Sequence, residues 1–153
     1  MKIHVLSDLH TEFEKFTPSS VEADVVVLAG DIGIRARGVE WAGEAFSCPV
    51  IYVPGNHEFY GGHLDSTLEK MRAAACERVR VLDNDEWILG GVRFLGATCW
   101  TDYTSTGNSF LAKYDAQQLT DYKKIRTAGY RKVRPDDFVW RKVISKENIT
   151  LLE

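Results

Sequence analysis

The chain has 153 residues, of which 44% are hydrophobic and 27% are charged, and its formal net charge is −3. This composition excludes a disordered, collagen-like or coiled-coil protein. The longest apolar run, residues 25–29, is far too short to cross a bilayer. We therefore predict one domain over residues 1–153, large enough to fold around a single core without disulfides.

The cysteines and the charge distribution indicate the cellular compartment and the kinds of partner to expect. Cys48, Cys76 and Cys99 are an odd number with no close pair, which is typical of a reducing compartment and predicts a cytoplasmic protein with no membrane partner. Basic side chains outnumber acidic ones only in residues 111–153. That segment is either a solvated face or a surface for a phosphorylated substrate, and a nucleic acid is not excluded as that substrate.

Short apolar runs alternate with amphipathic segments along the first half of the chain. Buried strands are predicted at residues 2–7 and 24–29, and a third strand at 49–53. Helices are predicted at residues 38–46 and 63–76. This alternation predicts an α/β fold, with a mostly parallel βαβαβ sheet and flanking helices.

The second half of the chain has weaker patterns. Strands are predicted at residues 79–82, 86–89 and 92–98, with Gly90-Gly91 as a tight turn between the last two. Residues 101–134 show no clean hydrophobic period, so we expect long loops with one helical turn near residues 120–125. The sequence Arg134-Pro135-Asp136-Asp137 is typical of a helix start, with Asp136 as the N-cap.

Three polar clusters directly follow the three predicted parallel strands. They are Ser7-Asp8-Leu9-His10, Gly30-Asp31-Ile32 and Gly55-Asn56-His57-Glu58. Loops after neighbouring parallel strands meet at the carboxyl edge of a sheet, so we expect these side chains to lie together. Carboxylates, an amide oxygen and imidazoles suit Mn, Fe, Zn or Ni rather than calcium.

Other polar and aromatic residues near these clusters have plainer expected roles. Glu58, Phe59 and Tyr60 are expected to pack in a loop, and His4 to pack within the first strand. His63 is expected to begin the second helix. Trp100 and Tyr103 follow a strand end, where they either line a substrate cleft or pack as aromatic side chains.

The order Asp-x-His, Gly-Asp, Gly-Asn-His-Glu resembles the calcineurin-like metallophosphoesterase family. The segment Leu119-Thr120-Asp121-Tyr122-Lys123-Lys124-Ile125-Arg126 is also similar to a stretch of uncharacterised bacterial members. The resemblance implies two divalent metals that turn a water into an attacking hydroxide, and hydrolysis of a phosphomonoester or phosphodiester. A Gly-x-Ser-x-Gly nucleophile motif is absent from the sequence, in agreement with such a mechanism.

The resemblance also implies a role for each motif residue. Asp8 and His10 hold the first metal, Asp31 bridges both metals, and Asn56 holds the second metal by its amide oxygen while also facing the substrate. His57 is the catalytic imidazole, which faces the phosphate and the leaving oxygen.

The sequence departs from the family pattern after residue 58. It contains neither the later isolated histidine nor the Gly-His-x-His segment, so the first metal lacks one imidazole and the second lacks two. We therefore expect either a truncated or a degenerate member, with weak or absent hydrolysis. The alternative function is a non-catalytic scaffold or interaction module of the same fold.

The family fold is a sandwich of two sheets with outer helices, and its second sheet is built largely by the part that is missing here. The sequence therefore predicts an incomplete sandwich. Apolar side chains of residues 79–98 would then remain uncovered. We therefore expect the chain to self-associate, either as a dimer that packs these surfaces together or by exchange of the segment after Arg134 between copies. These side chains are Val81, Leu82, Ile88, Leu89, Phe94 and Leu95.

Overall fold

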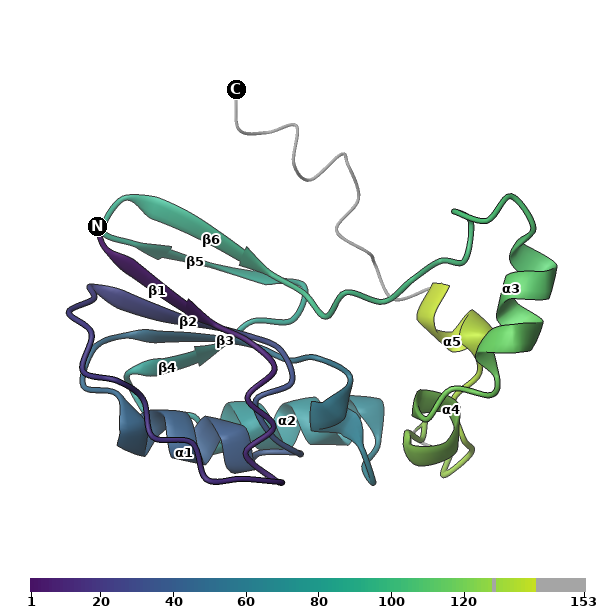
Figure 1. The fold of residues 1–153 in the computed structure, drawn as a ribbon, viewed down its shortest axis with the longest axis horizontal. Helices are drawn as coiled ribbons and strands as arrows, with labels where there is room; N and C mark the ends of the chain where they lie inside the picture. The colour runs from purple at the N-terminus through teal and green to yellow at the C-terminus, as the bar shows by residue number, and fades with distance from the viewer. Residues whose placement is uncertain (128, 140–153) are drawn as a thin grey trace.

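A four-stranded parallel sheet forms the centre of the computed structural model, which describes residues 1–127 and 129–139 (Figure 1). The strands lie in chain order across the sheet. They are β1 (Ile3–Leu6), β2 (Val25–Ala29), β3 (Val50–Val53) and β4 (Val79–Val81). All four strands point the same way, so the loops that follow them meet at one edge.

The two faces of the sheet are covered by different layers. Helices α1 (Arg37–Ala45) and α2 (Leu64–Ala74) lie together under one face, and the hairpin of β5 (Asp85–Leu89) and β6 (Val92–Gly96) lies over the other (Figure 1). Gly90 and Gly91 join the hairpin with φ angles of 55° and 79°, a conformation that glycine adopts without a steric penalty. The predicted α/β fold is confirmed, with the hairpin as a small second sheet.

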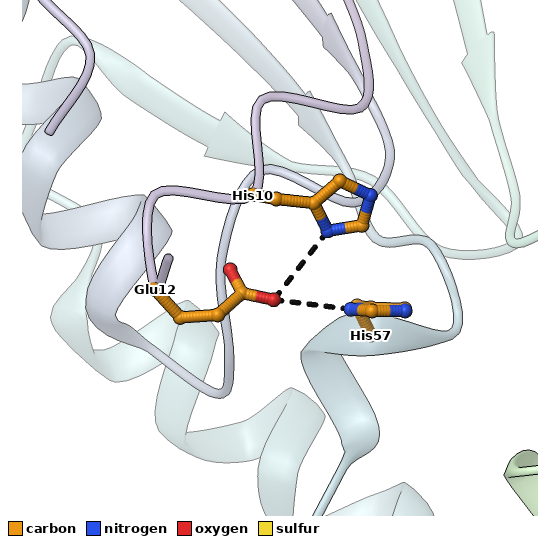
Figure 2. A group of neighbouring side chains, drawn as sticks. All are labelled: His10, Glu12 and His57. Atoms are coloured by element: carbon orange, nitrogen blue, oxygen red, sulfur yellow. Dashed lines mark hydrogen bonds and ion pairs between the residues drawn. The ribbon is translucent and has the colours of Figure 1, made fainter. Parts of the chain in front are cut away.

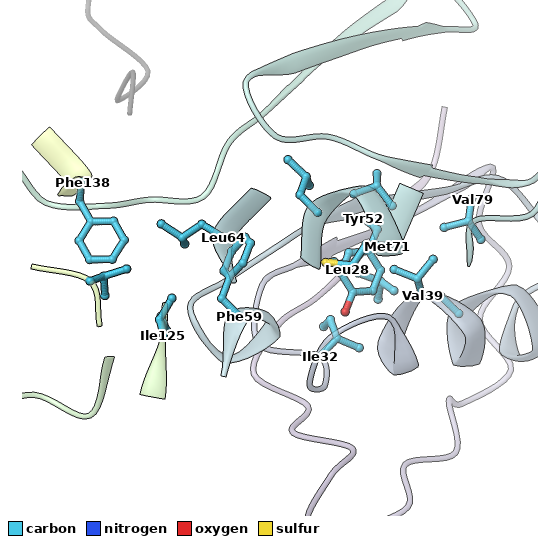
Figure 3. Close-up of a cluster of buried hydrophobic side chains, with 14 of the residues drawn as sticks. Leu28, Ile32, Val39, Tyr52, Phe59, Leu64, Met71, Val79, Ile125 and Phe138 are labelled. Atoms are coloured by element: carbon cyan, nitrogen blue, oxygen red, sulfur yellow. The ribbon is translucent and has the colours of Figure 1, made fainter. Parts of the chain in front are cut away.

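The hydrophobic core is divided between these layers. The larger cluster packs the sheet against the helices, with Leu28 and Tyr52 from the strands, Val39 from α1 and Met71 from α2 (Figure 3). A smaller cluster between the sheet and the hairpin is built on Val25, Ile51 and Leu82. The periodic apolar positions of α1 and α2 therefore face the sheet, as the sequence predicted.

The first strand is not buried on both faces, contrary to the prediction for residues 2–7. Among the strands of the described residues, β1 lies at the edge of the sheet and pairs with β2 alone. The side chains of Ile3 and Val5 are 45% and 59% exposed. They lie on the sheet face that the hairpin covers, but the hairpin packs over Val25 and Ile51. A continuous apolar run does not reveal whether a strand is central or at an edge.

Residues 101–139 form more helix than their sequence predicted. α4 (Asp121–Lys124) coincides with the expected helical turn, but α3 (Ser109–Ala116) was missed. α3 buries only Ala116 and leaves Phe110, Leu111 and Tyr114 exposed, so it has no apolar stripe. Its N-terminus is capped by Asn108, whose side-chain oxygen accepts a hydrogen bond from the backbone of Leu111.

The last described helix, α5 (Pro135–Val139), begins two residues earlier than predicted, since an N-cap at Asp136 would place the first helical residue at position 137. Asp136 is not its N-cap, because it is the second residue of the helix, where its carboxylate pairs with Lys113 at 2.7 Å. Instead, Asp137 accepts a hydrogen bond from the backbone N–H of Arg134 at 2.6 Å. The apolar residues 149–152 lie outside the described part of the chain. Within residues 1–127 and 129–139, no helix is both long enough and apolar enough to cross a membrane.

Candidate metal centre

The predicted polar clusters come together at the carboxyl edge of the parallel sheet. Asp8 and His10 lie in the loop after β1, Asp31 follows β2, and Asn56 and His57 follow β3. Backbone hydrogen bonds join the first two loops: Asp8 N–H donates to Gly30 at 3.0 Å, and His10 N–H donates to Asp31 at 3.0 Å. The loops are therefore fixed to one another as well as to the sheet.

Three of the site residues adopt the left-handed backbone conformation. The φ angles of Asp8, His10 and Asp31 are 54°, 45° and 56°. This conformation costs a non-glycine residue on the order of 1–3 kcal/mol and persists only where the surroundings impose it. The surrounding loops therefore hold these three residues in a conformation that an isolated chain would rarely adopt.

Gly55 allows the loop after β3 to approach the loop after β2. A Cβ atom at residue 55 would lie 2.7 Å from the backbone nitrogen of Asp31, which is too close for any other residue. The next residues form a short 3-10 helix, η1 (His57–Phe59), and the backbone N–H of His57 donates to Asp31 Oδ1 at 3.0 Å. Asp31 is thus held between the second and third loops.

Glu58 has a larger role than the loop packing that the sequence predicted. Its carboxylate is fully buried and accepts hydrogen bonds from the backbone N–H groups of Asp31, Ile32 and Gly55 at 2.8–3.1 Å, with a longer one from Gly33 at 3.4 Å. The hydroxyl of Tyr52 also donates to it at 2.8 Å.

Burial raises the pKa of Glu58 above its usual range, and these donors oppose the rise. Glu58 connects the loops after β2 and β3 from inside the protein. It therefore holds together the two loops that carry Asp31 and His57, and it does not belong to either group of potential ligands.

Asp8, His10 and Asp31 form a compact group of metal-ligand type. One ligand atom from each residue lies within 4.8 Å of the other two. Two carboxylates and an imidazole are donors that suit a transition-metal ion. The donor set that the sequence predicted for the first metal therefore fits such an ion.

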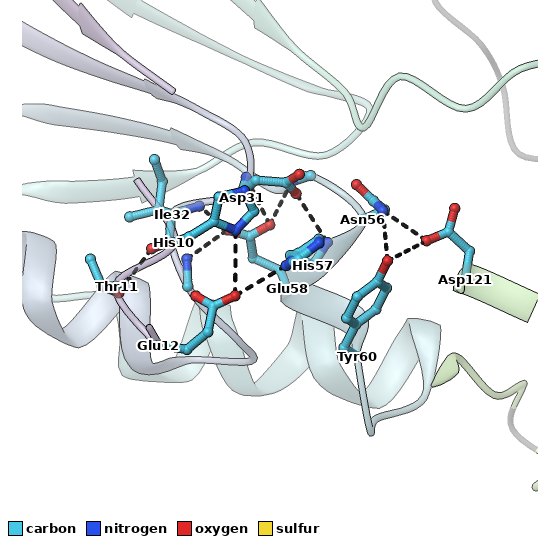
Figure 4. A network of polar contacts seen from close by, with 12 residues as sticks. His10, Thr11, Glu12, Asp31, Ile32, Asn56, His57, Glu58, Tyr60 and Asp121 are labelled. Atoms are coloured by element: carbon cyan, nitrogen blue, oxygen red, sulfur yellow. Dashed lines mark hydrogen bonds and ion pairs between the residues drawn. The ribbon is translucent and has the colours of Figure 1, made fainter. Parts of the chain in front are cut away.

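Asn56 is held by contacts that its motif does not contain. Its amide nitrogen donates to Asp121 Oδ1 at 2.7 Å and to the Tyr60 hydroxyl at 3.1 Å. Tyr60 donates to the same Asp121 oxygen at 2.8 Å. Burial and the Asp121 carboxylate raise the pKa of Tyr60, which keeps its hydroxyl as a donor. The amide oxygen of Asn56 consequently points away from Asp121 (Figure 4).

Glu12, like Asp121, contacts the predicted site residues although the sequence analysis did not assign it to the site. Its Oε1 lies 3.0 Å from His57 Nδ1 and 3.4 Å from His10 Nδ1, and the three residues form a second compact group of ligand type (Figure 2). Burial raises the pKa of Glu12, but the hydrogen bonds from His57 and His10 outweigh it, so the pKa lies below its usual range. The sequence could have indicated this role only through the position of Glu12, two residues after the predicted metal ligand His10.

A cavity of about 370 Å³ opens at this edge of the sheet. Asp8, Asp31, Asn56 and Asp121 line it, together with Trp100 and Tyr103. Both aromatic residues also pack.

Trp100 stacks on Phe138 with ring centroids 4.0 Å apart, and the hydroxyl of Tyr103 shares a hydrogen bond with that of Tyr122. Trp100 and Tyr103 therefore pack as aromatic side chains and also line the cavity, and a role in substrate binding stays a prediction.

The two remaining histidines lie apart from these groups. His4 is half-buried in β1, in agreement with a packing role. His63 immediately precedes α2, as predicted. Its ring packs edge-on against that of Tyr130, with the ring centroids 4.4 Å apart. Within residues 1–127 and 129–139, neither belongs to a cluster of potential ligands.

Comparisons with known proteins agree with the motifs. Residues 1–120 match the calcineurin-like phosphoesterase superfamily domain, whereas no curated protein matches the chain. Among solved structures, phosphopantetheinyl hydrolase (PptH) from Mycobacterium tuberculosis has the same fold, with a TM-score of 0.61 at 20% identity. The alignment covers 99% of this chain but 64% of the hydrolase, so this chain spans less than two thirds of the length of the hydrolase. The match over residues 1–120 shows that the chain belongs to the calcineurin-like phosphoesterase superfamily.

Proposed function

We propose that the site at the carboxyl edge of the sheet hydrolyses phosphate esters with the help of divalent metal ions. The convergence of Asp8, His10 and Asp31 within 4.8 Å carries this proposal. Uncompensated carboxylates at one place repel each other, and a bound cation removes that repulsion. Membership of the phosphoesterase superfamily supports the same reaction class.

Each residue has a distinct part in this proposal. Asp8, His10 and Asp31 hold one ion, and Asp31 together with the amide oxygen of Asn56 holds a second. When bound, such ions supply Lewis-acid chemistry at the phosphoryl group. The imidazole of His57 faces the phosphate, where its Nε2 atom accepts or donates a proton at an ester oxygen.

The cavity beside these residues accommodates the substrate. Trp100 and Tyr103 form its wall, so the group esterified to phosphate would lie against aromatic surface. A phosphomonoester and a phosphodiester both fit this chemistry.

The second ion is the weaker one in this proposal. The sequence has no histidine after His63, which leaves Asp31 and Asn56 as its ligands within residues 1–153. Since the loss of even an outer-shell partner lowers metal affinity or activity about 10–100-fold, we expect slow hydrolysis by this chain.

Metal binding and hydrolysis test the proposal separately. Titration calorimetry with Mn²⁺ should detect a site that is lost in Asp31→Asn and kept in Glu14→Gln, a change at an exposed residue of the same loop region. p-Nitrophenyl phosphate and bis-p-nitrophenyl phosphate, each with excess Mn²⁺, should show slow turnover that Asp31→Asn abolishes. Equal metal binding by the wild type and Asp31→Asn would contradict the proposal and favour a non-catalytic scaffold.

A further inference from the structure

We propose that Glu12 is a positioning residue, whose carboxylate orients the imidazoles of both His10 and His57 and fixes which ring nitrogen each presents to the site. The inference rests on the proposed function, in which His10 binds a metal and His57 faces the phosphate. It adds to the site a residue that the Asp-x-His and Gly-Asn-His-Glu motifs do not contain.

The geometry of the three residues carries the proposal. A single oxygen, Glu12 Oε1, faces Nδ1 of His57 at 3.0 Å and Nδ1 of His10 at 3.4 Å (Figure 2). A carboxylate can only accept hydrogen bonds, so each imidazole must donate from Nδ1. In a neutral ring, Nε2 then carries the free lone pair. One carboxylate thereby sets the tautomer of two imidazoles, whose centroids are 4.4 Å apart.

The hydrogen-bond partners of Glu12 distinguish it from a carboxylate that serves the fold. Its side chain is 10% exposed, and its second oxygen, Oε2, is buried with no hydrogen-bond partner among the described residues. Glu58 is buried too, but backbone N–H groups donate to both of its oxygens. The two imidazoles are therefore the side-chain donors that offset the desolvation of Glu12.

The turn that carries Glu12 is fixed on both sides of the residue. Thr11 donates from its backbone N–H and from its hydroxyl to the carbonyl of Ile32, each at 2.8 Å. The backbone N–H of Phe13 donates to the carbonyl of His10 at 2.9 Å. This attachment to the loop after β2 makes the position of the carboxylate reproducible, as an orienting group requires.

The arrangement has a consequence for the chemistry of the site. A metal-binding histidine commonly donates its other ring N–H to a carboxylate, which fixes the ring and makes the coordinating nitrogen more basic. Here the same carboxylate also holds the ring that faces the phosphate. The metal ligand and the proton-transferring group are thus connected through one residue, and the loss of Glu12 affects both.

The ¹⁵N chemical shifts of the imidazole nitrogens test this directly in metal-free protein. Spectra are recorded at pH about 8.5, well above the usual imidazole pKa of about 6.5, so that neutral rings report their tautomer. We expect wild type and the matched control Glu14→Gln to show His10 and His57 with the proton on Nδ1. Glu12→Met keeps the side-chain length without an acceptor, and it should return both rings to the tautomer mixture of a free imidazole.

Each other result has a definite meaning. Protonation of either wild-type ring at Nε2, or unchanged spectra in Glu12→Met, would overturn the proposal. If Glu12→Met does not fold, Glu12→Leu, which also lacks an acceptor, replaces it, and a wild-type-like tautomer at both rings there would overturn it. Binding of added Zn²⁺ at the two Nδ1 atoms would also overturn it, since Glu12 would then be a ligand. Because these measurements need neither substrate nor turnover, they stand apart from the test of hydrolysis.

Discussion

The carboxylate of Asp121 accepts a hydrogen bond from the amide nitrogen of Asn56 at 2.7 Å, although the two residues are 65 positions apart in the sequence. The contact joins α4 to the loop after β3 and directs the Asn56 amide oxygen away from Asp121 (Figure 4). An amide can rotate to exchange its oxygen and nitrogen, and Asp121 favours one of the two orientations.

Replacement of Asp121 should therefore weaken the proposed metal site through Asn56. We expect Asp121→Ala to lower Mn²⁺ affinity about 10-fold, the low end of the loss seen for outer-shell partners. Titration calorimetry measures the change, with Asp115→Asn on the exposed side of α3 as the control. Wild-type affinity in Asp121→Ala would show that the orientation of Asn56 does not matter for binding.

Glu58 should be essential for the stability of the fold rather than for chemistry. Glu58→Gln replaces one acceptor oxygen by an amide group that faces backbone N–H donors, and each lost buried partner costs about 1–3 kcal/mol. Because two or more donors face each carboxylate oxygen, we expect a loss of about 2–4 kcal/mol in the free energy of unfolding. Urea denaturation followed by circular dichroism provides the measurement.

The control for this variant is Glu44→Gln, at an exposed position of α1, which should change the free energy of unfolding by less than about 0.5 kcal/mol. A Glu58→Gln protein as stable as the control would mean that the loops after β2 and β3 do not depend on the buried carboxylate.

Asp137 should stabilise the C-terminal helix in a pH-dependent way. Arg131 donates two hydrogen bonds to its carboxylate, at 2.8 and 3.0 Å, and this lowers the pKa of Asp137 below 3.8. A lowered folded-state pKa means that the contribution is present above pH 3.8 and is lost as the pH falls through the folded-state value. The N–H of Arg134 also donates to Asp137.

At pH 7 we expect Asp137→Asn to lose about 1 kcal/mol of unfolding free energy, comparable with the loss of a helix cap. The difference from wild type should shrink as the pH falls towards about 3. Asp136→Asn is the matched control, because its ion pair with Lys113 is largely exposed and contributes little. A pH-independent difference would assign the effect of Asp137→Asn to packing.

The surface expected to cause self-association is smaller than the sequence predicted. Val81 and Leu82 are buried, and Leu89 and Phe94 pack in the smaller cluster. Ile88 and Leu95 remain 63% and 36% exposed on the outer face of the hairpin. Leaving such a side chain in water costs about 1.5–3 kcal/mol relative to burial.

We therefore expect sedimentation velocity at micromolar concentration to show association that Ile88→Lys reduces. Phe110→Lys, at an exposed apolar position of α3, is the control and should leave the association unchanged. A wild-type monomer throughout this concentration range would contradict the prediction.

The local sequence was sufficient to predict the elements that interact with their immediate neighbours. The apolar periods of residues 38–46 and 63–76 are set by the face that each helix buries, so both helices form nearly as predicted. Asp8, Asp31 and His57 were identified because each directly follows a predicted parallel strand, and parallel strands bring such positions to one edge.

The tertiary structure decided what depends on distant partners. Val5 is exposed because the hairpin packs over Val25 and Ile51 rather than over β1. Helix α3 forms without an apolar stripe that sequence analysis could detect. The roles of Glu12 and Asp121 could not be predicted, because an acidic side chain looks the same in sequence whether it faces water or another polar side chain. Their roles arise from the packing of the loop after β1 and of α4 against the site, which brings them within hydrogen-bond distance of His57 and Asn56.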